Sequence, residues 1–172
     1  TNSSTYTLVQ ADAGNTSNIT CVVTATNAAG SANATSNTIA QILTVRTNSF
    51  LTASAISDAT IRGGLNTFDI GLIANSLDTK MKAVYPFVAD GVDNNARALQ
   101  QRWNFMDARD LNAAFRLSFS GTLVHSSTGI NTNGTNGFYD TNFNCASNGS
   151  LNNQSAGVYI RTDLNGIGSS LD

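Results

Sequence analysis

The sequence predicts a mainly β protein in which an incomplete β-sandwich is followed by a second β-sandwich that contains one short helix. Only 12% of the 172 residues are charged, about half the usual share, while Ser, Thr and Asn together make up roughly a third. β-branched Thr suits pleated strands, and Asn with the 14 Gly residues suits tight turns. Short runs such as 19–26 and 115–119 alternate between apolar and polar residues, which is the pattern of half-buried strands.

The first forty residues predict three strands joined by tight turns. We expect strands over 5–10, 19–26 and 31–38, a corner at Asp12–Gly14, and a hairpin connection at 27–30, where Asn and Gly are suitable turn residues. This order is that of the closing half of an immunoglobulin-like sandwich, which needs a second sheet to bury its inner face. The sequence therefore predicts a partial immunoglobulin-like sandwich whose facing sheet comes from preceding residues of a longer polypeptide or from a neighbouring subunit.

The same residues resemble a known family. The segments YTL at 6–8, DAG at 12–14 and ITCVVTATNAAGS at 19–31 are similar to the end of the immunoglobulin-like repeats found in phage virion proteins and bacterial surface adhesins. The resemblance covers residues 5–38. It implies that residues 1–40 are the C-terminal half of such a domain, and that this domain acts as a spacer or docking module.

A linker at 41–49 and a second domain at 50–172 are expected to follow. Ser57 or Asp58 can cap a helix, and the sequence predicts one short helix near 58–74. The apolar residues of this segment fall at helical spacing and form one stripe: Ile61, Leu65, Phe68, Leu72 and Ile73.

The remainder of the second domain predicts short strands separated by turns. The first of them should end at Pro86 or lie at a sheet edge, because proline has no N–H to donate. We expect a turn at 91–95 and strands or extended segments at 80–88, 102–105, 115–119, 123–125 and 158–161. This pattern is typical of a jelly-roll-type β-sandwich, here expected to be truncated at its C-terminal end.

Four segments of the second domain resemble a domain that recurs in phage structural and tail-associated proteins. They are KMKAVYPFV at 80–88, FRLSFSG at 115–121, HSSTG at 125–129 and NGTNGFYDT at 133–141. The resemblance spans about residues 50–165. It implies a concanavalin-like sandwich in a bacteriophage particle, and it carries over no catalytic residue.

These resemblances imply a function. We expect a non-enzymatic structural component of a virion, such as a tail, fibre or capsid-decoration protein, displayed outward for assembly or host-surface contact. Its expected partners are other virion proteins and further copies of itself. The alternatives are a carbohydrate-binding adhesion module that recognises a host glycan, a bacterial surface adhesin and, last, a polysaccharide-degrading enzyme.

Composition argues against several other classes. The net charge is −2 without a basic cluster, so we expect no nucleic-acid partner, and no apolar run is long enough to predict a membrane span. The two cysteines, Cys21 and Cys145, cannot form a four-cysteine zinc site, and we expect Cys21 to be a small buried thiol. The Asn- and Asp-rich turns at 131–144 suit either calcium or simple Asx turns, and we predict no cofactor or metal site.

Two groups of residues are candidates for catalysis, and we favour a structural role for both. His125 is the only histidine, but no Gly-x-Ser-x-Gly nucleophile elbow is present. Asp107 and Asp110 could act as paired acids on a glycoside. With Arg109 and Arg116 they could equally form an ion-pair network that pins a loop to the sheet. The sequence therefore predicts no catalytic residue.

The segment 126–153 carries the predicted binding residues, because long loops rich in Asn and Gly often hold recognition sites. Aromatic rings can stack on sugars, and neighbouring polar groups can bond sugar hydroxyls. We expect contact with a glycan or a partner to involve Tyr139, Phe138, Asn136 and Asp140. The alternative is that these aromatic residues anchor the loop to the core. Trp103 and Tyr159 are further candidates for stacking, although core packing is favoured for Trp103.

Overall fold

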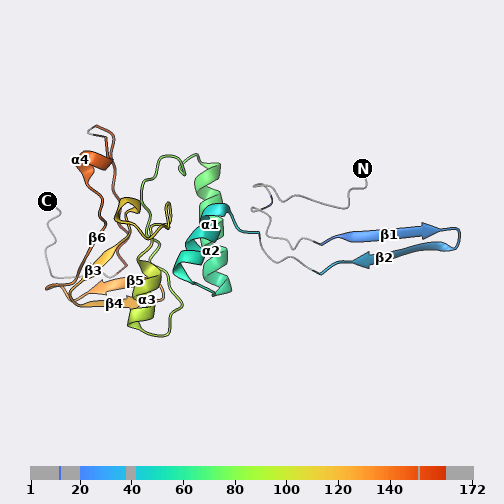
Figure 1. Ribbon diagram of the computed structural model, residues 1–172, viewed down its shortest axis with the longest axis horizontal. Helices are drawn as coiled ribbons and strands as arrows, with labels where there is room; N and C mark the ends of the chain where they lie inside the picture. Colours follow the sequence, from blue (N-terminus) through green and yellow to red (C-terminus); the bar gives the residue numbers. More distant parts are fainter. Residues whose placement is uncertain (1–11, 13–19, 38–41, 151, 162–172) are drawn as a thin grey trace. The chain divides into compact units, whose positions relative to one another are not determined.

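The structure, a computed structural model, describes residues 12, 20–37, 42–150 and 152–161. Within this part of the chain 30% of the residues are helical and 20% are in strands, and each sheet has only two strands (Figure 1). The predicted mainly β fold, with an immunoglobulin-like and a jelly-roll-type sandwich, is therefore wrong. A sandwich needs two broad sheets packed face to face, and the described residues contain no such pair.

The chain divides into two compact units, residues 1–142 and residues 143–172. The described elements are β1 (Val22–Asn27), β2 (Gly30–Thr35), α1 (Val45–Ser54), α2 (Ala59–Ala74), α3 (Asn94–Gln101), the 3₁₀ turn η2 (Asn112–Ala114), β3 (Ser118–Ser120), β4 (Leu123–Ser126), β5 (Gly129–Thr132), β6 (Phe138–Asp140) and α4 (Cys145–Asn148).

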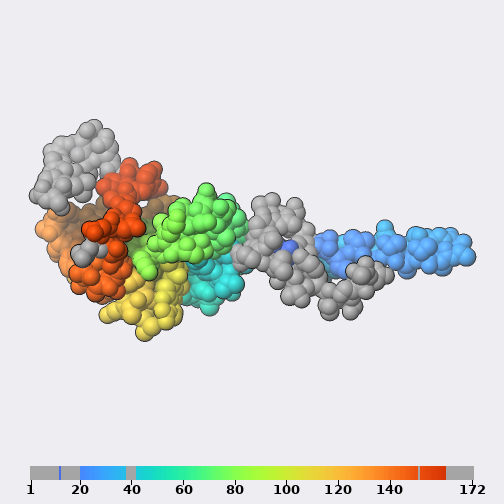
Figure 2. Space-filling model, turned by 90° about the horizontal axis from the view of Figure 1, so that it is seen from above, coloured from blue at the N-terminus to red at the C-terminus, as the bar shows by residue number. Residues whose placement is uncertain are grey.

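β1 and β2 form a regular antiparallel hairpin whose turn lies where the sequence predicts it. Asn27 pairs with Gly30, and the Ala29 N–H donates to Asn27 Oδ1 at 2.8 Å. Gly30 has a φ of 140°, a conformation that glycine adopts without strain. Figure 2 draws the hairpin in blue. Every residue of both strands is exposed, and the Cys21 thiol is exposed too. The predicted burial of Cys21 is therefore wrong, and the predicted strand at 5–10 lies outside the described residues.

α1 occupies much of the segment 41–49 that the sequence predicts as a linker. It begins after Thr44, whose Oγ1 accepts a hydrogen bond from the Thr47 N–H at 3.0 Å, and it ends at Ala55 in the left-handed conformation. Hydroxyl capping of this kind stabilises a helix start by about 1 kcal/mol. Phe50 and Leu51 are buried on the inner face of α1. This packing, rather than local propensity, explains why a Thr- and Ser-rich segment is helical.

α2 is the helix that the sequence predicts near 58–74. Asp58 caps it by accepting the Ile61 N–H at 2.8 Å, and the apolar stripe buries Leu65 and Leu72. Two polar side chains on α2 are also buried, and both bind Thr44 at the start of α1. Asn66 Oδ1 accepts a hydrogen bond from the Thr44 N–H at 2.8 Å. The Asp69 carboxylate accepts a hydrogen bond from the Thr44 hydroxyl and forms an ion pair with Arg46. These bonds fix the start of α1 against α2.

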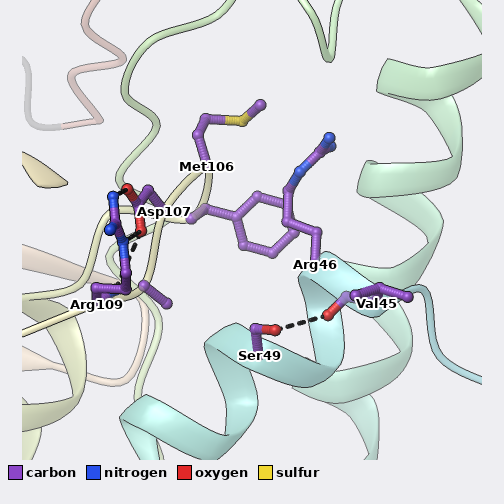
Figure 3. A pocket seen from close by; sticks show the side chains of 8 residues that line it. Val45, Arg46, Ser49, Met106, Asp107 and Arg109 are labelled. Carbon is purple, nitrogen blue, oxygen red and sulfur yellow. Dashed lines mark hydrogen bonds and ion pairs between the residues drawn. The ribbon is translucent and has the colours of Figure 1, made fainter.

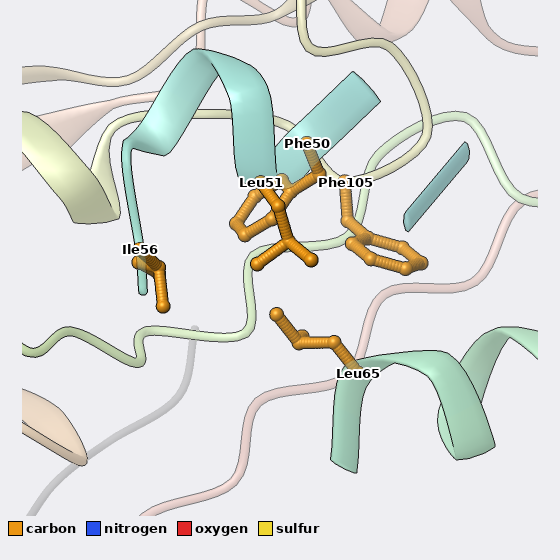
Figure 4. Close-up of a cluster of buried hydrophobic side chains, with 5 residues drawn as sticks. All are labelled: Phe50, Leu51, Ile56, Leu65 and Phe105. Carbon is orange, nitrogen blue, oxygen red and sulfur yellow. The ribbon is translucent and has the colours of Figure 1, made fainter. Parts of the chain in front are cut away.

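The core lies between α1, α2 and an irregular segment. It contains Phe50, Leu51, Ile56, Leu65 and Phe105, which converge in Figure 4. The rings of Phe50 and Phe105 are 5.2 Å apart in a tilted arrangement. Burial of one such side chain contributes about 1.5–3 kcal/mol.

The segment 80–88 is not a strand, although the sequence predicts one there. Its backbone is instead bonded by the buried amide of Asn104, which accepts from the N–H groups of Val84 and Met106 at 2.9 and 3.0 Å. The same amide donates to the carbonyls of Lys82 and Ala114 at 3.1 and 3.0 Å. A side chain thus satisfies backbone groups that a neighbouring strand would otherwise satisfy.

A helix, α3, begins within the segment 91–95, where the sequence predicts a turn, and includes its last two residues. Asp93 caps α3 by accepting the Ala96 N–H at 2.8 Å. Gly91 lies so close to the helix that a Cβ there would be 2.8 Å from the Ala96 Cβ. Gln100, near the end of α3, bonds back to the N–H groups of residues 90 and 91, which closes this part of the fold.

The Asp90 carboxylate joins this turn to the start of α2. It accepts the N–H groups of Ser57 and Asp58, both at 2.8 Å, and the side-chain amide of Gln100. Burial acts to raise its pKa, but these hydrogen bonds dominate and lower the pKa of Asp90 to about 2. Asp90 therefore stays ionised at neutral pH and holds the N-terminal end of α2 in place.

Of the last two strands predicted in the first unit, the one at 115–119 is shorter than predicted and the one at 123–125 is present. Phe115 has a φ of 59° and ends η2, so the alternation at 115–119 becomes the short strand β3, which pairs with β6. β4 pairs with β5 and lies where a strand is predicted at 123–125. Leu123 and His125 are buried on one side of β4.

The second unit contains the short helix α4, which Asn144 caps. The predicted strand at 158–161 is absent from the described residues, and Val158, Tyr159 and Ile160 are exposed. Among the helices that the structure describes, none combines the length and apolar character needed to cross a bilayer.

Replacing Asn104 by alanine should lower the free energy of unfolding by about 3 kcal/mol, because two partly buried N–H groups and two carbonyls lose their partner. Urea denaturation would measure this. The matched control is Asn95→Ala, at an exposed position of α3, which should change stability by less than about 0.5 kcal/mol. Equal stability of the two variants would contradict the role of Asn104.

Candidate binding face around Tyr139

A tight turn before β6 positions Tyr139. Asn133 Oδ1 accepts the N–H groups of Thr135, Asn136 and Gly137 at 3.1, 3.1 and 3.0 Å. Gly121 lies against this turn with a φ of 70°, and a Cβ there would be 1.9 Å from the Asn136 carbonyl oxygen. The local sequence therefore fixes where β6 begins.

The pairing of β3 with β6 decides which side chains share a face. Tyr139 lies opposite Phe119, so both project to the same side of the ribbon. Phe138 and Asp140, its neighbours in β6, project to the other side by alternation. Phe119 contacts the buried His125 ring at 4.6 Å, so the side that carries Tyr139 is the one that packs on the body.

Tyr139 ends a row of three aromatic rings. The centre of its ring is 5.6 Å from the centre of the Phe87 ring. Phe87 in turn stacks on Tyr85, with the two ring centres 6.2 Å apart. The Tyr85 hydroxyl donates to the Phe115 carbonyl at 2.6 Å. Burial, and then the nearby Asp140 and Tyr139, raise the pKa of Tyr85, so its hydroxyl remains a donor at all ordinary pH values.

Backbone strain gathers around this row. The described residues include five non-glycine residues with positive φ, and three of them, Phe87, Phe115 and Asn142, lie beside these rings or next to β6. Asn tolerates this conformation, but a bulky residue such as Phe adopts it at a cost of about 1–3 kcal/mol. Strain of this size persists only where surrounding contacts impose it, and it is frequent at functional sites.

The structure separates the four predicted binding residues. Tyr139 is 36% exposed and Phe138 is 58% exposed, but they lie on opposite faces of the ribbon. Asn136 Oδ1 accepts hydrogen bonds from Thr122 and Asn133 within the turn, so this group serves the loop. Asp140 is exposed and accepts the Asn142 N–H at 2.7 Å. The predicted residues of β6 therefore do not form one surface: Tyr139 lies on one face of the ribbon, and Phe138 and Asp140 lie on the other.

Sequence reasoning missed Phe87 as a neighbour of Tyr139. The sequence predicts a strand over 80–88, in which the side chains of Tyr85 and Phe87 would share one face of a sheet. The available signal was the Tyr85–Pro86–Phe87 sequence, since proline restricts the residue before it and disfavours a regular ladder.

The other two aromatic candidates lie elsewhere. Trp103 is half-buried, packs against the core and has the Arg102 guanidinium 5.3 Å from its ring centre. Tyr159 belongs to the second unit and is 86% exposed. Core packing is thus the observed role of Trp103.

His125 has a structural role in the first unit. Gln101 Nε2 donates to the carbonyls of Phe87 and Ser126 at 3.0 and 2.7 Å, so its Oε1 must face the His125 ring. His125 Nδ1, 2.8 Å from that oxygen, is therefore the donor. Burial lowers the pKa of His125, so the ring is neutral at pH 7.

Asp107 and Asp110 form ion pairs, as the structural alternative predicts. Arg109 bonds both oxygens of Asp107, and Asp110 pairs with Arg116 and with Arg102. The hydrogen bond from Arg109 lowers the pKa of Asp107, which keeps it ionised, whereas a glycosidase acid needs a raised pKa. These acids therefore hold the loop that follows Phe105.

A cavity of about 440 Å³ lies between α1 and this loop (Figure 3). Arg46 and Arg109 are its cationic residues. Arg46 is paired with Asp69 and Asp78, and Arg109 with Asp107. Because carboxylates already neutralise both guanidinium groups, the cavity offers an anion no unpaired charge. Its lining consists of Val45, Arg46, Ser49, Phe105, Met106, Asp107, Ala108 and Arg109.

The described residues contain no group of three or more His, Cys, Asp or Glu side chains that could hold a metal ion. In the segment 131–144, for which the sequence suits either calcium or Asx turns, the Asn133 oxygen accepts backbone N–H groups, as in an Asx turn. The chain matches no protein-family model, no curated protein and no solved structure.

His125 should make stability depend on pH. The pKa of His125 in the folded state lies below the unfolded value of about 6.5. As the pH falls through 6.5, the unfolded state therefore binds more protons than the folded state does. The contribution is complete above about pH 6.5 and is lost progressively below it. Urea unfolding of wild type and His125→Gln between about pH 8 and 5 would measure this. The stability difference between the two proteins should shrink at lower pH, and a constant difference would contradict the assignment.

Proposed function

We propose that this chain is a non-enzymatic structural component of a phage particle, in a tail, fibre or capsid-decoration position, and that it docks through the β1–β2 hairpin. The observation that carries this proposal is the complete exposure of both strands. A two-stranded hairpin alone in water is only marginally stable. The hairpin therefore gains stability when it packs on a partner.

The two faces of the hairpin differ in chemistry. Val23 lies opposite Ala34, and Ala25 lies opposite Ala32, so these four side chains share one face. The other face carries mainly Thr, Ser and Asn side chains. A hairpin with one small, apolar face suits packing against a partner sheet.

The hairpin also lacks the features that keep strand edges unpaired. Residues 20–37 include no Asp, Glu, Lys, Arg or Pro. Natural edge strands that stay solvated usually carry charged residues, proline or a bulge. An uncharged protein partner can cover this segment without burying an unpaired charge, and can add a strand to its edge.

Two further observations support this function. The candidate catalytic residues His125, Asp107 and Asp110 are engaged in hydrogen bonds or ion pairs that hold the fold. The phage location follows only from the sequence resemblance of the segments 19–31 and 133–141, although the sandwich folds that this resemblance implies are wrong. Other virion proteins and further copies of the chain are the proposed partners, and the virion is the proposed location.

The test uses phage particles assembled with variant chains, with the amount per particle measured by mass spectrometry. Ala25→Lys places a charge on the apolar face and should reduce incorporation at least tenfold, because docking would bury an unpaired charge. Thr24→Lys, at the adjacent position on the polar face, is the matched control and should incorporate normally. Absence of the wild-type chain from purified particles, or equal incorporation of both variants, would refute the proposal.

A further inference from the structure

We propose that β2 pairs edge to edge with β2 of a second copy of this chain, around a two-fold axis at Asn33. The inference deepens the proposed function and rests on it for the docking role of the hairpin, since it names the partner of the free edge of that hairpin. It is carried by the direction of the main-chain groups of β2, by the absence of charge along the strand, and by the match of the strand with itself.

The edge of β2 that faces away from β1 has main-chain groups without a strand partner. The Ser36 N–H donates to the Cys21 carbonyl at 2.8 Å, which identifies these two residues as a hydrogen-bonded pair of the ladder. In an antiparallel ladder such pairs alternate with pairs that exchange no hydrogen bond. The N–H and C=O groups of Ser31, Asn33 and Thr35 therefore point away from β1, and the sheet has no third strand among the described residues to bond them.

No charge along this edge repels an identical strand. Residues 20–37 include no Asp, Glu, Lys, Arg or Pro. Proteins that keep identical edges apart usually place a charge, a proline or a bulge on the edge strand. A sheet of two strands is marginally stable, whereas three or more strands with an apolar face can be stable. A second copy supplies two further strands and thereby meets this condition.

β2 also matches itself when the two copies run antiparallel. A two-fold axis at Asn33 places this residue opposite Asn33 of the second copy, and Ser31 opposite Thr35. An amide and a hydroxyl each contain both a donor and an acceptor, so each side chain can bond its counterpart. On the other face Ala32 lies opposite Ala34, and these small side chains let the strands approach closely. Cross-strand pairs of this kind stabilise a sheet.

The free edge of β1 matches itself less well. The same two-fold pairing of β1, centred on Thr24, would place Val22 opposite Thr26. The Thr26 hydroxyl, which already bonds Ser31 Oγ at 2.9 Å, would then face an apolar side chain. The two-fold contact therefore belongs to β2.

Pairing through β2 also enlarges the apolar face of the hairpin. Ala32 and Ala34 share that face with Val23 and Ala25. In the paired sheet the two copies present these residues side by side on one surface. The face that the proposed function buries in the particle is therefore doubled.

Exchange of charge at Asn33 tests the two-fold contact, by sedimentation equilibrium of the purified full chain at low salt over a range of concentrations. The wild type should form dimers. Asn33→Lys and Asn33→Glu should each weaken the dimer at least about tenfold, because like charges then lie directly opposite each other. An equal mixture of the two variants should dimerise within about threefold of wild type, because a lysine then faces a glutamate.

Thr24→Lys and Thr24→Glu are the matched controls. Thr24 lies opposite Asn33 within the hairpin, on the same polar face, but on the outer strand of the paired sheet. These variants should dimerise like wild type, alone or mixed. The rescue in the Asn33 mixture also guards against misfolding, since unfolded variants cannot restore a specific contact.

Hydrogen exchange of main-chain N–H groups, followed by NMR, is a second measurement on the folded wild type. The N–H groups of Ser31 and Thr35 point away from β1, so their exchange should slow as the protein concentration rises, but not in Asn33→Lys. Three results would overturn the proposal: a wild-type chain that is monomeric at every concentration, equal effects of the Asn33 and Thr24 variants, or assemblies that grow without limit instead of stopping at the dimer.

The outcome is separable from that of the particle experiment. Dimers that follow the charge pattern, in a chain that is absent from purified particles, would refute the proposed function alone. Incorporation that Ala25→Lys reduces, in a chain that stays monomeric in solution, would refute this inference alone.

Discussion

The first unit depends on the hydrogen bonds of one buried amide, that of Asn104. It bonds four backbone groups from three stretches of chain, around residues 82–84, at 106 and at 114. The next residue is Phe105, whose ring lies in the core against Phe50. The amide thus satisfies the irregular backbone at the position where the chain enters the core. Because every donor and acceptor of the amide is used, the irregular segment has no need of a neighbouring strand.

The same principle operates throughout the described body. Asn66, Gln100 and Gln101 are also buried, and each bonds main-chain groups from distant segments. The composition that suggested β-surfaces, rich in uncharged polar residues and poor in charge, therefore has a second use. Amide side chains replace ladder hydrogen bonds, and two-stranded ribbons with helices are enough to form the fold. Such networks stabilise the folded state only when every buried donor and acceptor is hydrogen-bonded, since a buried unpaired amide is costly.

The hairpin and the ribbon around Tyr139 are in opposite physical situations. The hairpin contributes no buried side chain, so its sequence is free to match a partner. Tyr139 is exposed only in part, and its orientation depends on Phe87 and on the strand opposite. An assembly surface such as the hairpin can be read from exposure, charge and strand register. The orientation of a ring such as that of Tyr139 can be read only from which distant residues support it.

The sequence by itself determined the elements whose signals are local. The cap at Asp58 with the following apolar stripe located α2, and Asn27 with Gly30 located the hairpin turn, because those hydrogen bonds span only a few residues. Tertiary structure alone decided that 80–88 is irregular and that Phe87 supports Tyr139. Those outcomes depend on side chains about twenty or more residues away in sequence, such as Asn104, and such long-range bonds leave no periodic pattern in the chain.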